Sequence, residues 1–172
     1  MRWQDVGKLD CTIARALSVV GDRWTLLVLR DAFLGQRRFE GFQASLGVSR
    51  HRLADRLAKL VKHGVLRRER YQTRPPRWEY RLTEKGLDLY GVIVTVAEWG
   101  DKHMAGRKGR PVERIHKACG HATSLKLTWE HCGEPVHARN MSARPGAGWR
   151  TSDRTAGRSE PKEAPRGAGG IS

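Results

Sequence analysis

The sequence is poor in the features that define secreted, membrane-spanning and disulfide-rich proteins. Its 172 residues include only three cysteines, Cys11, Cys119 and Cys132, which are too few and too scattered for a disulfide framework. No apolar run reaches the roughly 20 residues that a membrane-spanning helix needs. The N-terminus, MRWQDVGKLD, lacks the apolar segment of a secretory signal. We therefore expect a cytoplasmic protein with reduced thiols and no membrane partner.

The motifs of the common enzyme classes are also missing. The chain has no P-loop, no GxGxxG fingerprint, no HExxH motif and no GxSxG motif. The only cluster of catalytic residue types is a Cys/His segment at 112–141, and it lacks a clear general base and an enclosing domain. We therefore do not expect an enzyme.

Positive charge, in contrast, is abundant and unevenly placed. The net charge is +15. Residues 46–81 hold 11 Lys and Arg against three acidic residues, a balance of +8, whereas residues 1–45 carry +2 and residues 82–100 carry −2. A clustered basic patch is the electrostatic footprint of a nucleic-acid-binding protein.

The spacing of apolar residues predicts four helices in the first half of the chain: 12–20, 23–34, a short helix with Phe39, Phe42 and Leu46 on one face, and an amphipathic helix within 48–64. Thr12 is expected to cap the first helix and Asp22 the second, while Gly47 makes the turn before the fourth, which Ser49 caps. The inward stripe of the first helix is predicted to consist of Ile13, Ala16, Leu17 and Val20.

The fourth predicted helix has two contrasting faces. Leu53, Leu57 and Leu60 recur at helical spacing and are expected to face a core. The opposite face is polar and mostly basic, with His51, Arg52, Asp55, Arg56, Lys59 and Lys62. Such a face is either simply solvated or meets a polyanion.

Strands and a longer helix are predicted to follow. Trp78, Tyr80 and Leu82 alternate with charged residues, which is typical of a half-buried strand. Residues 65–71 form its expected partner and 72–76 the connecting loop. Thr83 is expected to cap a helix over 84–104. Its apolar residues exceed one stripe, which indicates a second subunit.

This order of elements predicts a mainly α, α+β fold, the winged helix-turn-helix. In that geometry the N-terminal half of the fourth helix enters the major groove of DNA and the strands form a wing beside it. The side chains expected to reach double-stranded DNA lie on this helix and on the wing: Ser49, Arg50, His51, Arg52, Arg56, Arg74 and Arg77. Ser49 suits a phosphate at a helix N-terminus, and arginine suits bidentate bonds to guanine.

Several segments together resemble the HxlR family of bacterial transcriptional regulators over about the first hundred residues. They are residues 11–31 (CTIARALSVVGDRWTLLVLRD), RRFEGF from 37, VSRHRLADRLAKLVKHGVL from 48, PPRWEYRLTEKG from 75 and AEWG from 97. The resemblance implies a winged-helix homodimer, formed through the first and last helices, that binds an inverted-repeat operator.

Cys11 occupies the position of an N-terminal cysteine that, in some members of this family, reacts with electrophiles or oxidants. It lies at a predicted helix start, where the helix dipole favours a thiolate. Arg15, one turn later, supports this reading and Asp10 opposes it. The resemblance thus allows Cys11 to be a redox sensor, and the protein to respond to an oxidant or a small-molecule effector. The alternative is that Cys11 is simply a small residue packed at a helical interface.

The segment at 112–141 also has two interpretations. Cys119 and Cys132 could form a tetrahedral N/S zinc site with two of His116, His121, His131 and His137. The candidate set is Cys119, His121, Cys132 and His137. Some HxlR relatives are expected to have a further cysteine three residues before Cys132, where this chain has Trp129. We favour a small β-hairpin in which Leu125, Leu127 and Trp129 point inward, and we commit to no metal or other cofactor.

The predicted organisation is a winged-helix and dimerisation domain at 1–104, a hinge at 105–111, the small extension at 112–141 and a disordered tail at 142–172, which is too poor in large apolar residues to fold. The predicted function is sequence-specific transcriptional regulation. The alternative is a non-specific or architectural nucleic-acid-binding protein, because contacts to phosphates alone carry no sequence information.

Overall fold

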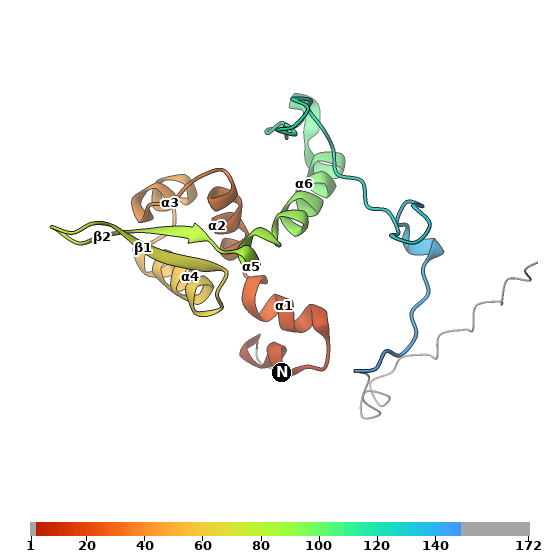
Figure 1. Cartoon of the computed structure of the whole chain (residues 1–172), viewed down its shortest axis with the longest axis horizontal. Coiled ribbons are helices and arrows are strands. Elements are labelled where there is room, and N and C mark those ends of the chain that lie inside the picture. Colours follow the sequence, from red (N-terminus) through yellow and green to blue (C-terminus); the bar gives the residue numbers. More distant parts are fainter. Residues whose placement is uncertain (1–2, 149–172) are drawn as a thin grey trace, which may run out of the picture. The chain divides into compact units, whose positions relative to one another are not determined.

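The computed structural model of the chain describes residues 3–148 and divides it into two compact units, Met1–Leu125 and Lys126–Ser172. Among the described residues, no helix is both long and apolar enough to cross a membrane. The elements of the first unit, labelled in part in Figure 1, are η1 (Trp3–Lys8), α1 (Thr12–Val20), α2 (Arg23–Phe33), α3 (Phe39–Leu46), α4 (Arg50–Lys62), β1 (Leu66–Gln72), β2 (Arg77–Leu82), α5 (Glu84–Leu87), α6 (Tyr90–Met104) and η2 (Gly106–Lys108).

The hydrophobic core of the first unit lies where α2, α3, α4 and the start of β1 meet. The stripe predicted for α4 is confirmed, because Leu53, Leu57 and Leu60 are each at most 1% exposed. Burying one large aliphatic side chain contributes about 1.5–3 kcal/mol, so this stripe fixes which face of α4 points outward. The fully buried apolar side chains from the other elements are Val28, Leu29, Phe42, Val65 and Leu66.

Side-chain N-caps mark the beginning of α2 and of α4, and a glycine makes the turn before α4. Ser49 caps α4 by accepting a hydrogen bond from the Arg52 N–H, and Asp22 caps α2 by accepting one from the Trp24 N–H, as the sequence predicts. Gly47, at the end of α3, has a φ of +61°, in the left-handed region that favours glycine. The turn between α3 and α4 therefore depends on this residue.

Strands β1 and β2 form an antiparallel hairpin, residues 66–82, which we call the wing. In Figure 1 it projects beyond α3 and α4. The segment just before α3 lines the free edge of β2, because the Tyr80 N–H donates to the Arg37 carbonyl and Arg38 bridges to Glu79. The wing is thereby attached to the helix-turn-helix as well as to the core.

Side chains alternate along a strand, so the wing has two faces. The inner face starts in the core with the pair Leu66 and Leu82 and continues outward with Arg68 opposite Tyr80. The outer face is joined by ion pairs that link its arginines and glutamates, Arg67, Glu69, Glu79 and Arg81. Only the arginines of the inner face and of the tip are therefore free of carboxylate partners in this hairpin.

The prediction of one continuous helix over 84–104 is wrong, because the structure has two helices there. α5 ends at Leu87 and α6 begins at Tyr90. The first turn is held by its surroundings: Thr83 caps it, and a Cβ on Gly86 would lie 2.2 Å from the Val65 carbonyl oxygen. This close approach fixes α5 against the start of β1, and the chain turns before continuing as α6.

Two details predicted for the first helix are also wrong. Cys11, and not Thr12, occupies the N-cap of α1, and its side chain makes no capping hydrogen bond. Of the predicted inward stripe, Val20 is buried as expected, whereas Ile13 and Leu17 are 70% and 39% exposed; Ala14, which was not in the stripe, is buried. The periodicity identified an apolar face correctly, but only its C-terminal end, Val20, joins the core of the chain.

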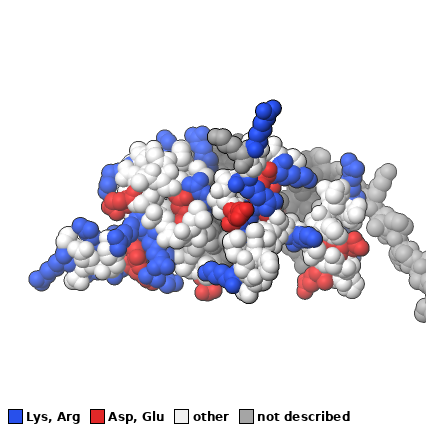
Figure 2. Space-filling view, turned by 90° about the horizontal axis from the view of Figure 1, so that it is seen from above, with Lys and Arg blue, Asp and Glu red and all other residues white. Residues whose placement is uncertain are grey.

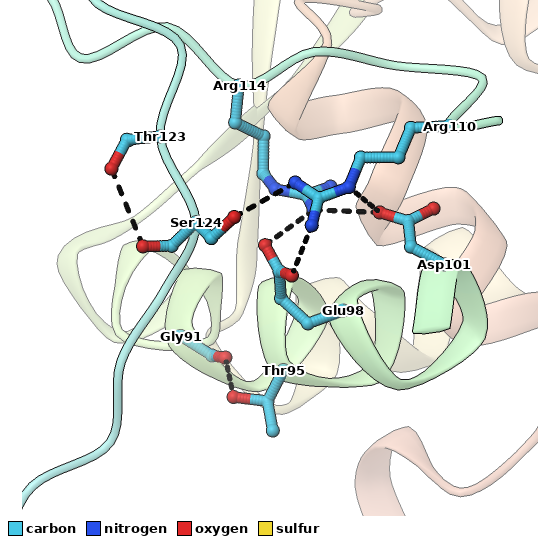
Figure 3. A network of polar contacts seen from close by, with 8 residues as sticks. All are labelled: Gly91, Thr95, Glu98, Asp101, Arg110, Arg114, Thr123 and Ser124. Carbon is cyan, nitrogen blue, oxygen red and sulfur yellow. Dashed lines mark hydrogen bonds and ion pairs between the residues drawn. The ribbon is translucent and has the colours of Figure 1, made fainter. Parts of the chain in front are cut away.

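The chain after α6 returns along this helix and is attached to it by a cluster of ion pairs (Figure 3). The Arg114 guanidinium lies 2.6 Å from Glu98 and 2.9 Å from Asp101, and Arg110 contacts the same two carboxylates. Arg110 also donates to Ser124 Oγ. The segment predicted as a hinge at 105–111 thus contains η2 and one member of this cluster.

We expect this attachment to weaken in acid. The hydrogen bond from Arg114 is the main cause that holds the pKa of Glu98 below its usual value. A carboxylate whose pKa is lowered on folding stabilises the folded form above its unfolded pKa, and this contribution disappears as the pH falls through the folded pKa. NMR resonances of residues 110–124 should therefore shift on acidification. Glu98→Gln should show the shifted spectrum already at pH 7, and Glu113→Gln, the control, should not.

The extension at 112–141 does not form the expected single hairpin. The structure has two separate bridged turns, Ile115 with Ala122 in the first unit and Thr128 with Pro135 in the second. The predicted inward residues Leu125, Leu127 and Trp129 are 42%, 51% and 39% exposed, because so short a segment has no second layer to pack against.

The second unit also contains η3 (Ala138–Asn140). Residues 142–148 of the predicted tail contain no helix or strand, and the rest of that tail, from residue 149, lies outside the described residues.

Candidate nucleic-acid interface

The first turns of α4 present an exposed group of polar and basic side chains. The exposed residues are Ser49, Arg50, His51 and Arg52. On the opposite face, the leucine stripe packs α4 against the core. His51 Nδ1 lies 3.3 Å from Asp55. The structure therefore brings four of the predicted DNA-binding residues together at one helix end.

Arg50 is held in place by its neighbours on α3. Its guanidinium carbon lies 4.9 Å from the centre of the Phe39 ring, and Nη1 donates to Gln43 over 3.4 Å. Neither contact neutralises its charge. Arg52 has a longer contact, 6.0 Å, with the Trp24 ring. An arginine that is oriented before binding loses less side-chain entropy when it meets a ligand.

Arg56 has a different environment from the other predicted DNA-binding residues. Its Nε lies 3.0 Å from Oδ1 of Asp22, and its side chain is only 28% exposed. The Nε is buried and the pair lacks a well-aligned hydrogen bond, so the interaction is mainly one of charge. In this structure Arg56 connects α4 to the N-terminus of α2 and does not extend into solvent.

Asp22 has two roles in this arrangement, which substitution can separate. Asp22→Ala removes both the cap of α2 and the partner of Arg56, so we expect a loss of about 1–2 kcal/mol in the free energy of unfolding. Asp22→Asn can still cap, since asparagine caps as well as aspartate does, and should lose less than about 1 kcal/mol. Urea unfolding measures both; equal losses would show that the cap contributes nothing.

The wing contributes Arg74 and Arg77, which are both exposed at and beside its tip. Figure 2 shows Lys and Arg side chains at the end from which the wing projects, as well as elsewhere on the same face. At the C-terminal end of α4, burial lowers the pKa of His63, and the nearby Lys59, Lys62 and Lys85 lower it further. The positive charge of this region therefore surrounds α4 at both ends.

Two further arginines, which were not predicted from the sequence, belong to the same surface. Arg38, just before α3, lies 4.7 Å from the Tyr71 ring, and Arg68 on the inner face of the wing lies 4.4 Å from the Trp78 ring. The alternation of the strands contains a signal for Arg68, which shares the inner face with Tyr80. No signal in the sequence shows that Arg38 faces the wing.

Within the described part of the chain, the cysteines and histidines do not come together in one site. Cys11 is partly exposed, while Cys119 and Cys132 are exposed, and all three are free thiols. Nδ1 of His116 lies 3.3 Å from the sulfur of Cys119. Within residues 3–148, no group of three or more His, Cys, Asp or Glu side chains is placed to hold a metal ion.

Comparison with known proteins identifies the family of the protein that carries this surface. The model of the HxlR-like helix-turn-helix family matches residues 19–108. The HTH-type transcriptional regulator Rv3095 of Mycobacterium tuberculosis is 44% identical over 139 residues, which cover 81% of this chain and 88% of that protein. The chain belongs to the HxlR-like helix-turn-helix family. The resemblance given by its sequence segments is thus confirmed.

Solved structures agree with this assignment. PA1607, described as a candidate transcription factor, is 33% identical with a TM-score of 0.73, and the match covers 81% of this chain and 98% of that one. PA1374 of Pseudomonas aeruginosa is 33% identical with a TM-score of 0.57 over 85% of this chain and 99% of its own. The redox regulator HypR in its reduced form is 29% identical, with a TM-score of 0.51 over 54% and 92%.

The family and its members establish the general role of this HxlR-family protein. It is a transcriptional regulator with a helix-turn-helix DNA-binding fold, and it is not an enzyme. The winged helix-turn-helix fold class predicted from the sequence is also confirmed.

Proposed function

We propose that this regulator binds an inverted-repeat operator as a homodimer, with the first turns of α4 reading base edges and the wing contacting the adjacent backbone. The observation that carries the proposal is the position of Arg50. It is exposed, oriented by Phe39 and Gln43, and free of any carboxylate partner among the described residues. A guanidinium in this state suits bidentate hydrogen bonds to guanine.

The other side chains have separate roles in this proposal. His51 and Arg52 extend the reading surface, and Ser49 offers a helix N-terminus to a phosphate. Arg74 and Arg77 of the wing contact phosphates or the minor groove. We assign Arg56 to a positioning role in the free protein, since its ion pair with Asp22 fixes the orientation of α4; its guanidinium reaches DNA only by leaving that pair.

The homodimer is supported by apolar surface on two helices. On α6, Val92, Val96 and Trp99 lie at helical spacing and are 48%, 53% and 60% exposed. On α1, Ile13 and Leu17 form a second exposed stripe. Two apolar helix faces on one monomer are typical of a subunit interface. A two-fold dimer would place two copies of α4 about one DNA turn apart, roughly 34 Å.

The experiment that tests sequence specificity is a salt titration of binding. Genomic fragments bound by the purified protein would be selected and sequenced, and the affinity for the enriched fragment would be compared with that for random DNA from about 50 to 200 mM salt. Specific binding predicts an affinity ratio of about 10³ or more that persists as salt rises. An architectural protein predicts equal affinity for all fragments, with the same steep salt dependence.

A redox response is the finer part of the proposal. Cys11 is the partly exposed N-cap of α1, the helix that also carries the exposed stripe, so a covalent modification there would disturb the proposed subunit contact. The similar protein HypR is named a redox regulator.

We expect diamide to reduce operator affinity in the wild type and to have no effect in Cys11→Ser. In the double variant Cys119→Ser/Cys132→Ser, diamide can only join the Cys11 thiols of two copies of the chain in a disulfide, and their two hydrogens reduce it to the hydrazine. This variant should respond as the wild type does. A Cys11→Ser protein that still responds would exclude Cys11 as the sensor.

A further inference from the structure

The first unit contains a cavity beside the proposed DNA-reading surface. Its volume is about 730 Å³, and it lies between the N-terminus of α3, the first residue of α4 and the inner face of the wing. This volume falls within the range of about 300–1,000 Å³ found for small-molecule sites. The proposed DNA contacts at α4 and the wing tip do not require a cavity of this size.

The lining of the cavity is strongly positive. Arg38, Arg50, Arg68 and Arg77 all contribute to it, against the single carboxylate of Glu40. Among the described residues, none of these four guanidiniums forms an ion pair, whereas the arginines on the outer face of the wing do. The site is therefore suited to an anion, and in the free protein its arginines are without carboxylate partners.

Aromatic rings alternate with these arginines. Arg38 lies over Tyr71, Arg50 over Phe39 and Arg68 over Trp78, at 4.4–4.9 Å from guanidinium carbon to ring centre. Tyr80 and Pro76 add further apolar surface to the same lining. Each ring restricts the guanidinium beside it, so the cavity presents oriented fork-shaped donors next to flat apolar surface.

We propose that this cavity binds a small planar aromatic carboxylate, with the carboxylate held by Arg68 and Arg38 and the ring against the aromatic side chains. An arginine fork matches the two oxygens of a carboxylate, and the rings match a flat apolar body. A phosphate of the DNA backbone would use the charge of the lining but would not use its apolar surface.

The position of the cavity gives the ligand a regulatory consequence. Arg50 and Arg77 line it and also belong to the proposed DNA-binding set. An occupied cavity would engage both side chains and bring a negative charge to the DNA-facing surface. The ligand and DNA should therefore compete; this part of the inference rests on the proposed function, whereas ligand binding itself does not.

The first experiment titrates the full-length protein with 2-naphthoate in the absence of DNA, followed by tryptophan fluorescence. We expect saturable binding whose signal is reduced in Trp78→Phe. The amide 2-naphthamide tests the charge and cyclohexanecarboxylate tests the aromatic ring, and both should bind at least tenfold more weakly. Arg68→Gln and Arg38→Gln should each weaken 2-naphthoate binding about 10- to 100-fold, as expected for the loss of a charged hydrogen bond.

The matched control is Arg81→Gln, which removes the same charge from the wing outside the cavity lining and should leave binding unchanged. Thermal unfolding of each variant checks that it folds. The proposal is overturned by non-saturable binding, by equal binding of the amide, or by full affinity in both folded cavity variants.

The second experiment adds DNA. In the wild type, 2-naphthoate should lower the apparent DNA affinity, and Arg68→Gln should require about 10- to 100-fold more ligand for the same effect. If the protein binds 2-naphthoate but shows no sequence-specific DNA binding at all, the proposed function is wrong and the ligand site stands. If DNA binding is specific and 2-naphthoate neither binds nor competes, the cavity serves the DNA backbone only and the inference is wrong.

Discussion

Replacing Arg50 with alanine is expected to reduce operator affinity by about 10- to 100-fold while reducing affinity for random DNA much less. A bidentate arginine–guanine contact contributes about 1–3 kcal/mol of discrimination, and Arg50 is the predicted reading residue that its own neighbours orient best. Arg74→Ala, at the wing tip, should instead weaken binding to both DNAs to a similar extent, because a phosphate contact does not distinguish sequences. Fluorescence anisotropy with both fragments at one salt concentration measures the ratio.

The control for Arg50 is Lys62→Ala, which removes one positive charge from the exposed C-terminal end of the same helix. It should lower both affinities slightly and keep their ratio. Should Arg50→Ala retain the full ratio, the reading surface is assigned to the wrong side chains, although the helix-turn-helix fold would be unaffected.

The elements that carry the proposed interface could be predicted because local signals and core packing agree there. Leu53, Leu57 and Leu60 repeat at helical spacing and are buried, and Ser49 caps the helix as expected. Gly47 allows the turn that precedes it. Once these positions are fixed, the exposed face of α4 follows from helix geometry alone.

The parts that could not be predicted depend on contacts between distant residues. The contact that holds α5 in place, Gly86 against the Val65 carbonyl, joins distant residues and is not recorded by any local pattern. Arg56 has the same spacing as an exposed residue, yet Asp22, far away in the sequence, partly covers it. The cavity likewise exists only because Arg38 and the wing are folded against each other.

The exposed stripe of α1 also depends on a contact that lies outside the monomer. Periodicity identifies an apolar face but not the surface that covers it. Ile13 and Leu17 have the spacing of core residues, and in the monomer they face solvent. An apolar face that packs on its own chain and one that packs on a second copy produce the same pattern. The periodicity alone therefore predicted an inward stripe, whereas the resemblance to the HxlR family implied the subunit contact that is now proposed.

The substitution Val96→Asp should therefore convert the proposed dimer into a folded monomer. Val96 is 53% exposed in the monomer and lies between Val92 and Trp99 on one face of α6, so the change costs little within one chain. In a symmetric dimer it buries two carboxylates without partners, at several kcal/mol. Sedimentation velocity should show the monomer mass, with an unchanged circular dichroism spectrum.

Operator affinity should fall in the same variant by about 10²- to 10⁴-fold, because two linked half-site contacts become independent. The matched control is Leu34→Asp, at the C-cap of α2, where an apolar residue that is 64% exposed lies outside both stripes; it should remain dimeric. Ile13→Asp on α1 should behave like Val96→Asp if both helices form one interface. A Val96→Asp protein that stays dimeric with full affinity would move the interface elsewhere, and the exposed face of α6 would then need another partner.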